Sequence, residues 1–187
     1  RLVRYQALLT KWNSAINLVA PATLADARIR HIEDSAQLWT LCAPQSGHWV
    51  DLGSGGGLPG IVVSIMAQGT DVHVTLVESD QRKATFLRTV IRELQLTQVS
   101  VISQRIEELA PLLADFLSAR ALAPMINLLP MIQRHLAPDG QAWLLKGARW
   151  RDECDAAQSE WQFNLRHFPS MTNPDAAILT ISGVSHA

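Results

Sequence analysis

The sequence predicts an α/β protein whose core is a mostly parallel sheet with helices on both faces. After residue 47, short apolar runs alternate with amphipathic helical segments, an order typical of parallel strands joined by helices. The first of these runs leads into a glycine-rich loop within Trp49–Ile61, WVDLGSGGGLPGI. The last two runs are separated only by the turn Pro169–Asp175, so we expect an antiparallel hairpin at the edge of the sheet.

Residues 1–46 have a different pattern and are predicted to form a helical extension packed on a core of residues 47–187. Apolar side chains at spacings of three and four predict a first amphipathic helix, and they are Leu2, Tyr5, Leu8, Leu9 and Trp12. A second helix is expected over Thr23–Leu41. Its basic residues on or beside the apolar stripe are Arg28, Arg30 and His31. Trp12 and Trp39 are expected to hold the extension against the sheet.

The elements of the core follow from their length and apolar pattern. The predicted strands are His48–Leu52, Val72–Val77, Val99–Ile102, Asp115–Ser118, Gln141–Leu145, Trp161–Phe168 and Ala176–Ser182. The predicted helices are Leu58–Ala67, Arg82–Leu94, Ile106–Leu112, Pro124–Leu136 and Trp150–Ser159. The expected sheet therefore has seven strands.

Composition and charge limit the kind of protein. With 187 residues, of which 48% are hydrophobic and 18% charged, the chain can form one globular domain with a substantial core. The formal net charge of −1 gives no overall sign of nucleic-acid binding, so any basic surface must be local. Because Cys42 and Cys154 lie far apart without zinc-ligand spacing, we expect no metal site and no disulfide, as in a reducing compartment.

No segment predicts membrane insertion or export. The most apolar run, around Leu58–Ala67, is too short to cross a bilayer, and no signal peptide is visible. We therefore expect a cytoplasmic protein with no membrane contact. Because the sequence begins at Arg1 rather than Met, we also expect further residues to precede it in the complete protein.

The glycine-rich loop is the first candidate ligand site. Five glycines fall within the eight residues 53–60, and each costs about 0.5–1 kcal/mol relative to alanine inside a helix or strand. In an open α/β sheet, ligands bind beyond the carboxyl ends of the strands, often at the first loop. Pro59 suits the first turn of the following helix, where no amide hydrogen is needed. The loop thus lets a ligand touch bare backbone near free helix amides.

Two cofactor interpretations compete for this loop. Gly55, Gly57 and Gly60 fit the dinucleotide pattern GxGxxG, which is weak evidence when it stands alone. The register that begins at Asp51 and continues with Gly53 and Gly55 resembles motif I of the class I, Rossmann-like S-adenosylmethionine-dependent methyltransferases. A carboxylate suits a ligand with an ammonium and a sulfonium better than it suits a pyrophosphate. We therefore favour S-adenosylmethionine.

Acidic residues after the second and third strands extend the pattern. Glu78 lies about 20 residues past the glycines, where an acid accepts hydrogen bonds from ribose hydroxyls, although this feature alone would also suit NAD. After the third strand, Ile106 is placed to cover an adenine ring and Glu107 to meet its amine. Glu108 is more simply a solvated acid in the first turn of a helix.

Five segments together carry a more specific resemblance. They are KWNSAINL (Lys11–Leu18), RHIEDS (Arg30–Ser35), DLGSGGGLPGI (Asp51–Ile61), ARALAP (Ala119–Pro124) and LLKG (Leu144–Gly147). In order and spacing they resemble the bacterial small-subunit ribosomal RNA guanine-N7 methyltransferases, also called glucose-inhibited division protein B. The resemblance covers nearly the whole chain. It implies a class I fold with an N-terminal helical extension, S-adenosylmethionine as methyl donor and a guanine in a 16S rRNA loop as acceptor.

The resemblance also assigns residues to the site. Together with the motif register, it implies cofactor binding by Asp51, Gly53, Gly55, Leu58, Glu78, Ile106, Glu107 and Arg120. It implies that the catalytic cleft is faced by His31, Asp34, Arg120 and Lys146. Simpler interpretations stay open, because His31 and Asp34 could pair on a helix surface and Arg120 could be an ordinary surface residue. Asn13 could be a cap that closes the first helix.

Methylation of the implied acceptor, guanine N7, is consistent with the residue types expected at the site. Guanine N7 carries an in-plane lone pair, so its methylation needs no strong general base, and none is obvious. After the fourth strand the chain has Ser-Ala-Arg-Ala, whereas an adenine-N6 enzyme would carry Asn/Asp-Pro-Pro-aromatic. The RNA would rest on local cations, for which there are three candidate clusters: Arg28, Arg30 and His31; Arg82, Lys83, Arg88 and Arg92; and Lys146, Arg149 and Arg151. The first and third would flank the cofactor site and are favoured, whereas Arg88 and Arg92 are more simply solvated helix surface.

The expected partner is 16S rRNA or a small-subunit particle, and the chain is expected to act as a monomer. Two other functions are weighed against this one. A methyltransferase acting on a small molecule would suit the weak net charge but would leave the basic extension without a purpose. The other is a non-catalytic S-adenosylmethionine-binding module that only docks on rRNA or on a division-related partner, and the intact motif positions at Gly53, Glu78 and Arg120 argue against it.

Overall fold

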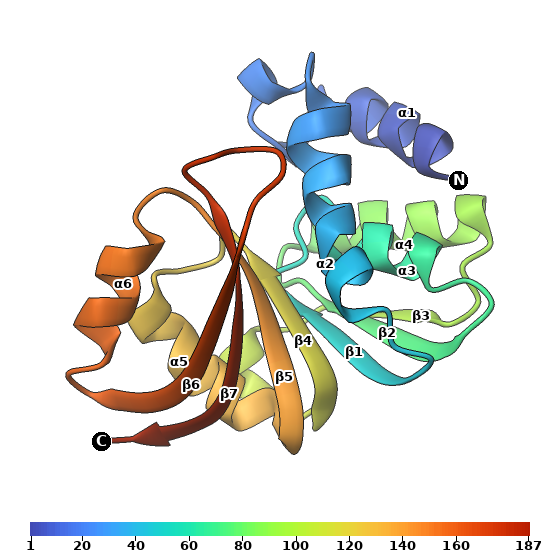
Figure 1. The fold of residues 1–187 in the computed structure, drawn as a ribbon. Helices are drawn as coiled ribbons and strands as arrows, with labels where there is room; N and C mark the ends of the chain where they lie inside the picture. Colours follow the sequence, from blue (N-terminus) through green and yellow to red (C-terminus); the bar gives the residue numbers. More distant parts are fainter.

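Seven strands form a single sheet in the computed structural model, which describes all residues 1–187, in the order β3-β2-β1-β4-β5-β7-β6 (Figure 1). The strands are β1 Ser46–Leu52, β2 Asp71–Val77, β3 Val99–Ile102, β4 Ala114–Arg120, β5 Leu136–Lys146, β6 Trp161–Pro169 and β7 Ala177–His186. Strands β1 to β5 pair in parallel, and β7 is antiparallel to both β5 and β6. The predictions of a mostly parallel seven-stranded sheet and of an edge hairpin are confirmed.

Helices cover both faces of this sheet. They are α1 Leu2–Asn13, α2 Asp34–Cys42, α3 Gly60–Met66, α4 Gln81–Leu94, α5 Met125–His135 and α6 Trp150–Ala157. Figure 1 shows α1 to α4 on one side of the sheet and α5 and α6 on the other. Each layer has its own apolar core, with Trp49, Leu76 and Phe86 in the first and Leu117, Leu129 and Leu179 in the second. The sheet order reverses between β1 and β4, which is where an open α/β sheet binds ligands.

The single helix predicted over Thr23–Leu41 is wrong. The chain forms a 3-10 turn at Pro21–Thr23 and a π-helical segment at Arg28–Glu33 before α2 begins. The hydroxyl of Thr23 donates a hydrogen bond to the carbonyl of Ala20 at 2.7 Å, which closes the turn locally instead of extending a helix. The apolar spacing marked the buried side of this segment but could not reveal its change of helical pitch.

The helix predicted over Ile106–Leu112 is also wrong, because only a 3-10 turn, Ile106–Glu108, forms there. Pro111 disfavours the helical conformation at the residue before it, so the turn cannot continue. Helix α3 begins at Gly60 rather than Leu58, and Pro59 occupies its N-cap position rather than its first turn.

Several strands are longer than predicted because sheet pairing continues through polar residues. Strand β4 reaches Arg120, which pairs with Leu145. Strand β7 continues to His186, which pairs with Trp161 of β6. Helix α6, in contrast, is shorter than predicted, because it ends at Ala157, two residues before the expected end at Ser159.

The extension packs closely on the core through aromatic residues. The ring centroids of Trp12 in α1 and Phe86 in α4 lie 5.6 Å apart, and those of Trp39 in α2 and Trp49 in β1 lie 6.5 Å apart. The prediction that Trp12 and Trp39 hold the extension in place is therefore confirmed. The division of the chain at residue 46 stays a prediction.

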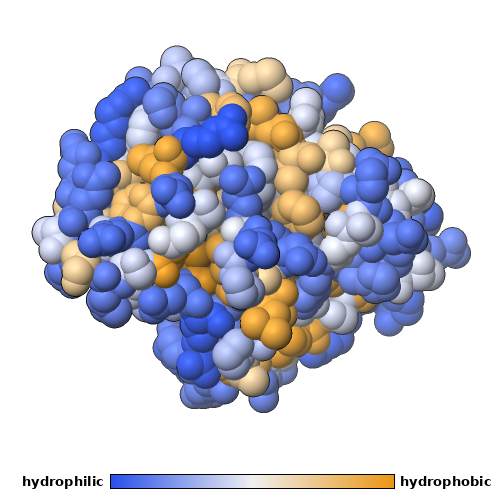
Figure 2. Space-filling view, turned by 60° about the horizontal axis from the view of Figure 1, so that its bottom comes forward, coloured by the Kyte–Doolittle hydropathy of each residue, from blue (hydrophilic) through white to orange (hydrophobic).

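The molecular surface is mixed in character. Figure 2 shows small orange groups of hydrophobic residues separated by hydrophilic ones on the face drawn. None of the helices combines the length and the apolar character that crossing a bilayer would require.

Candidate active site

The glycine loop between β1 and α3 is held from below by Asp51. This side chain is fully buried, and its two carboxylate oxygens accept hydrogen bonds from the backbone amide of Gly60, at 3.2 Å, and the hydroxyl of Ser118, at 2.7 Å. Burial raises the pKa of Asp51 to about 6, against the opposing effect of these hydrogen bonds. Asp51 lies beneath the loop and does not line the cavity above it, so a direct contact between Asp51 and the ligand stays a prediction.

The same loop is held from the other side by the extension. The hydroxyl of Tyr5, in α1, donates a 2.6 Å hydrogen bond to the carbonyl of Gly56, and Tyr5 is fully buried. A Cβ at Gly56 would lie 3.1 Å from a methyl of Leu9 and 3.2 Å from Leu18, so glycine permits the close approach. The sequence analysis placed Tyr5 only on an apolar stripe. A buried tyrosine needs a partner for its hydroxyl, which is the signal that could have pointed to the loop.

A cavity of about 410 Å³ opens above the loop at the carboxyl ends of β1, β2 and β4. It is lined by seven of the eight residues predicted to bind the cofactor: Gly53, Gly55, Leu58, Glu78, Ile106, Glu107 and Arg120. Its volume lies within the range of about 300–1,000 Å³ found for small-molecule sites. The structure therefore brings the predicted residues together, with Asp51 as the exception.

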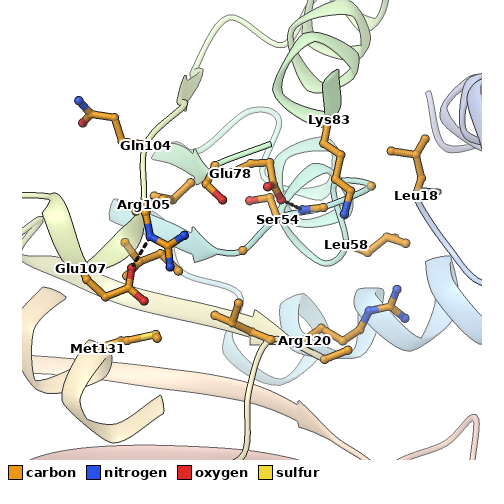
Figure 3. Close-up of a pocket in the computed structure, with 18 residues that line it drawn as sticks. Leu18, Ser54, Leu58, Glu78, Lys83, Gln104, Arg105, Glu107, Arg120 and Met131 are labelled. Atoms are coloured by element: carbon orange, nitrogen blue, oxygen red, sulfur yellow. Dashed lines mark hydrogen bonds and ion pairs between the residues drawn. The ribbon is translucent and has the colours of Figure 1, made fainter. Parts of the chain in front are cut away.

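Glu78 lines the middle of this cavity, between the other residues of its wall (Figure 3). One carboxylate oxygen accepts a hydrogen bond from the amide of Gly55 and the other from the amide of Asp80, both at 2.8 Å. Each oxygen keeps a further lone pair, so the carboxylate can still accept hydrogen bonds from two neighbouring hydroxyls. In Figure 3, Glu107 and Met131 lie on one side of Glu78, and Leu18 and Leu58 lie on the other. The cavity can thus hold a nucleoside whose ribose meets Glu78.

Several residues of the cavity wall were not predicted. Among them are Leu18, Ser54, Lys83, Gln104 and Met131. Leu18 reaches the cavity because Asn13, at the end of α1, accepts hydrogen bonds from the amides of Leu18 and Val19, each at 2.9 Å. The interpretation of Asn13 as a residue that closes the first helix is therefore confirmed, and it also places Leu18.

A second cavity of about 550 Å³ adjoins the first, and Arg120 lines both. Its walls come from the extension, the segments after β4 and β5, and the β6–β7 hairpin, and they include Arg30, Asp34, Lys146, Arg149 and Thr172. The ammonium of Lys146 donates to the carboxylate of Glu153 at 2.7 Å and to the carbonyl of Ala123 at 2.8 Å. Lys146 is thus at the predicted place, but two partners already hold its charged group.

Arg120 is held at the junction of the two cavities. Its guanidinium donates a 3.1 Å hydrogen bond to Nδ1 of His31 and lies 3.8 Å from a carboxylate oxygen of Asp34. Burial lowers the pKa of Arg120, and Asp34 opposes that effect. The alternative that Arg120 is an ordinary surface residue is wrong, since only 19% of its side chain is exposed.

His31 lies behind Arg120 rather than in either cavity. Because Nδ1 accepts from Arg120, Nε2 carries the proton and donates to the hydroxyl of Thr23, 2.7 Å away. Burial, with Arg120 and Arg30 adding to it, lowers the pKa of His31 to about 4. The expectation that His31 faces the cleft is therefore not met. The alternative pairing of His31 with Asp34 is also wrong, since Asp34 faces Arg120, Thr172 and Gln37 instead.

Residues 1–178 match the family described as GidB, rRNA small subunit methyltransferase G. The chain belongs to this family. Curated relatives named ribosomal RNA small subunit methyltransferase G include one from Paracoccus denitrificans, 54% identical over 100% of this chain and 96% of that protein. Another, from Cereibacter sphaeroides, is 49% identical over 100% of this chain and 90% of that protein. Membership in the rRNA methyltransferase G family confirms the resemblance found in the sequence and the prediction of a methyltransferase.

Solved structures with a similar fold include methyltransferases. The ribosomal protein L11 methylase of Lactobacillus delbrueckii subsp. bulgaricus has a TM-score of 0.65 at 15% identity, over 82% of this chain and 78% of that one. The glycopeptide N-methyltransferase MtfA, complexed with S-adenosylmethionine, has a TM-score of 0.66 at 11% identity, over 81% of this chain and 93% of that one. These likenesses confirm the predicted class I, Rossmann-like fold.

The basic residues of this methyltransferase differ in whether their side chains are exposed or engaged by a neighbouring residue. Arg30 and Arg149 are exposed and line the second cavity. By contrast, Arg28 pairs with Glu33 at 3.0 Å, and Arg151 lies over the ring of Trp150 at 4.3 Å. Lys83 points into the first cavity (Figure 3). The exposed arginines on the walls of the second cavity are therefore Arg30 and Arg149.

The neutral state of His31 predicts a pH effect on stability. Its pKa is about 4 when folded and about 6.5 when unfolded, so its contribution is present above pH 6.5 and is lost as the pH falls toward 4. Between pH 7 and pH 4 the free energy of unfolding should fall by about 3 kcal/mol more in the wild type than in His31→Gln. Urea unfolding at both pH values measures this difference, in which the other groups cancel.

The exposed His73 in β2 provides the matched control for this measurement. His73→Gln should keep the pH dependence of the wild type. Equal pH dependence in wild type and His31→Gln would show that His31 is not held neutral.

Proposed function

We propose that this chain transfers the methyl group of S-adenosylmethionine to N7 of a guanine in a conserved loop of 16S ribosomal RNA. The observation that carries the proposal is the meeting of two cavities at Arg120, one suited to a nucleoside and the other bordered by cations. Family membership supports both the cofactor and the ribosomal substrate.

The first cavity fits S-adenosylmethionine by the chemistry of its walls. Glu78 would accept hydrogen bonds from the two ribose hydroxyls, Ile106 would cover the adenine, and the amides of the glycine loop would meet the amino-acid end of the molecule. When bound, S-adenosylmethionine supplies an electrophilic methyl group on a positively charged sulfur. The task of the chain is to hold that methyl group in line with an incoming nucleophile.

The second cavity suits an acceptor that needs no base. Its carboxylates are engaged, since Asp34 accepts from Thr172 and lies near Arg120, while Glu153 accepts from Lys146. Guanine N7 attacks through its own lone pair, so no proton has to be removed first. A cation that donated to N7 would occupy that lone pair. Arg120 therefore acts on O6 or on a flanking phosphate, with N7 left free.

The target base must leave its stack to enter such a cavity, which favours a nucleotide in a loop over one in a duplex. The exposed Arg30 and Arg149 would meet phosphates around it. The proposed partner is 16S rRNA or a small-subunit particle, and the chain is proposed to act on it as a monomer in the cytoplasm.

Tritiated methyl transfer tests the proposal. The protein is incubated with methyl-tritiated S-adenosylmethionine and either naked 16S rRNA or small subunits from cells that lack this enzyme. We expect label on one guanine, with strand scission there after borohydride and aniline, which cleave at N7-methylguanosine. Label on another atom of the RNA would contradict the N7 assignment. Label confined to a small molecule would instead support the alternative of a small-molecule methyltransferase.

A further inference from the structure

An exposed methionine lies in the loop that joins β6 and β7. Few large hydrophobic side chains are exposed in this structure, and Met171 is 81% exposed. Figure 1 shows the loop that carries it, between β6 and β7, reaching toward α2. A single exposed apolar residue is ordinary on a protein surface, so its place and its support decide whether it has a role.

The backbone around Met171 is fixed, although its side chain is free. The amide of Met171 donates a 2.7 Å hydrogen bond to the side-chain oxygen of Gln37, which is buried in α2. The hydroxyl of Thr172 donates to Asp34 at 2.7 Å, and the hydroxyls of Ser170 and Thr172 lie 3.0 Å apart. Hydrogen bonds thus fix three consecutive residues, so Met171 is exposed on an ordered segment of the loop.

These hydrogen bonds place Met171 at the rim of the second cavity. Its neighbours Ser170 and Thr172 both line the second cavity, whereas the side chain of Met171 does not. Asp34, which holds Thr172, also lies 3.8 Å from Arg120 at the junction of the two cavities. One short network therefore fixes the position of the exposed methionine relative to the site where the guanine would react.

We infer that Met171 is a wedge, which fills the gap left in the RNA stack when the target guanine turns into the second cavity. This inference rests on the proposed function. A base that leaves its stack exposes the faces of its two neighbours, and an inserted apolar side chain, methionine included, covers them. Methionine is suited to this task because it is unbranched and polarisable and packs well on aromatic rings.

The surrounding charges favour RNA over a protein as the occupant of this rim. Arg30 and Arg149 are exposed on the walls of the adjoining cavity, where they can meet the phosphates on either side of an extruded nucleotide. A wedge acts on the extruded state rather than on docking. Its loss should therefore lower kcat more than it raises KM.

Methyl transfer to small subunits that lack the modification tests the wedge. Met171→Ala should lower kcat by about tenfold, consistent with the unstacking cost of a base, and leave KM within about twofold. Met171→Leu should restore most of the activity because it restores the apolar bulk. Val3→Ala is the matched control, since Val3 is 83% exposed on α1 and borders neither cavity.

A second measurement separates a wedge from a simple contact. A 16S rRNA fragment with 2-aminopurine next to the target guanine should become more fluorescent with wild-type protein and Met171→Leu, but less so with Met171→Ala. A kcat for Met171→Ala within twofold of the wild type, or a change in KM alone, would overturn the inference. A wild type that labels no guanine would overturn the proposed function itself, and that result is visible without any variant.

Discussion

Replacing Arg120 with alanine is expected to abolish methyl transfer under ordinary assay conditions, a loss of about a thousandfold. Arg120 is the residue that lines both cavities among those predicted to be catalytic. Removing it takes the positive charge from the junction of the two cavities, where donor and acceptor would meet under the proposed function. Initial rates of tritium transfer to small subunits measure the effect.

Two variants separate the loss of this contact from a loss of structure. Arg149→Ala removes the same charge from the wall of the second cavity, where Arg149 is exposed, and should raise KM while leaving kcat nearly unchanged. Arg120→Lys keeps the charge but not the planar fork that reaches His31 and Asp34, so partial activity is expected. Circular dichroism should show that Arg120→Ala stays folded. Activity of Arg120→Ala within a factor of two of the wild type would show that Arg120 has no such role.

The parts of the site that the sequence predicted are those encoded locally. The glycine loop, Glu78 after β2 and Arg120 at the tip of β4 each stand where one strand ends, and parallel strands end at the same edge of a sheet. Alternating apolar runs were therefore enough to bring these residues to one cavity. The same reasoning placed Lys146 at the end of β5, although it could not show that Glu153 holds it.

The parts that the sequence did not predict depend on contacts between distant residues. Tyr5 reaches Gly56 across 51 positions, Ser118 reaches Asp51 across 67, and Arg120 reaches His31 across 89. The last two of these contacts bear on assignments made from the sequence. Asp51 supports the loop from beneath, and His31 supports Arg120 instead of facing the cleft. Periodicity reports which side of an element is buried but not which polar group it meets there.

The N-terminal extension contributes to the site through such polar and packing contacts, which its sequence pattern did not reveal. Tyr5 and Leu9 contact the glycine loop. Leu18 lines the first cavity, and His31 accepts a hydrogen bond from Arg120. The residues before β1 thus contribute to both cavities. Their contribution explains why the class I sheet alone does not account for the geometry at Arg120.

Replacing Glu78 with alanine should weaken S-adenosylmethionine binding by about 100-fold. The variant loses the acceptor for the two ribose hydroxyls, and a hydrogen bond to a charged group contributes about 1.5 kcal/mol or more. It also frees the amides of Gly55 and Asp80, which the carboxylate of Glu78 now fixes at 2.8 Å each. Isothermal titration calorimetry measures the change in Kd directly, without any RNA substrate.

Glu108→Ala is the matched control for this titration, because it removes an exposed carboxylate one residue beyond the cavity wall. It should bind S-adenosylmethionine like the wild type, whereas Glu78→Gln should show an intermediate loss because one acceptor oxygen remains. A Kd for Glu78→Ala within about threefold of the wild type would mean that Glu78 holds only the loop and that another group meets the ribose. Tighter binding of NAD than of S-adenosylmethionine to the wild type would contradict the cofactor itself, since Glu78 suits the ribose of either molecule and the loop must make the distinction.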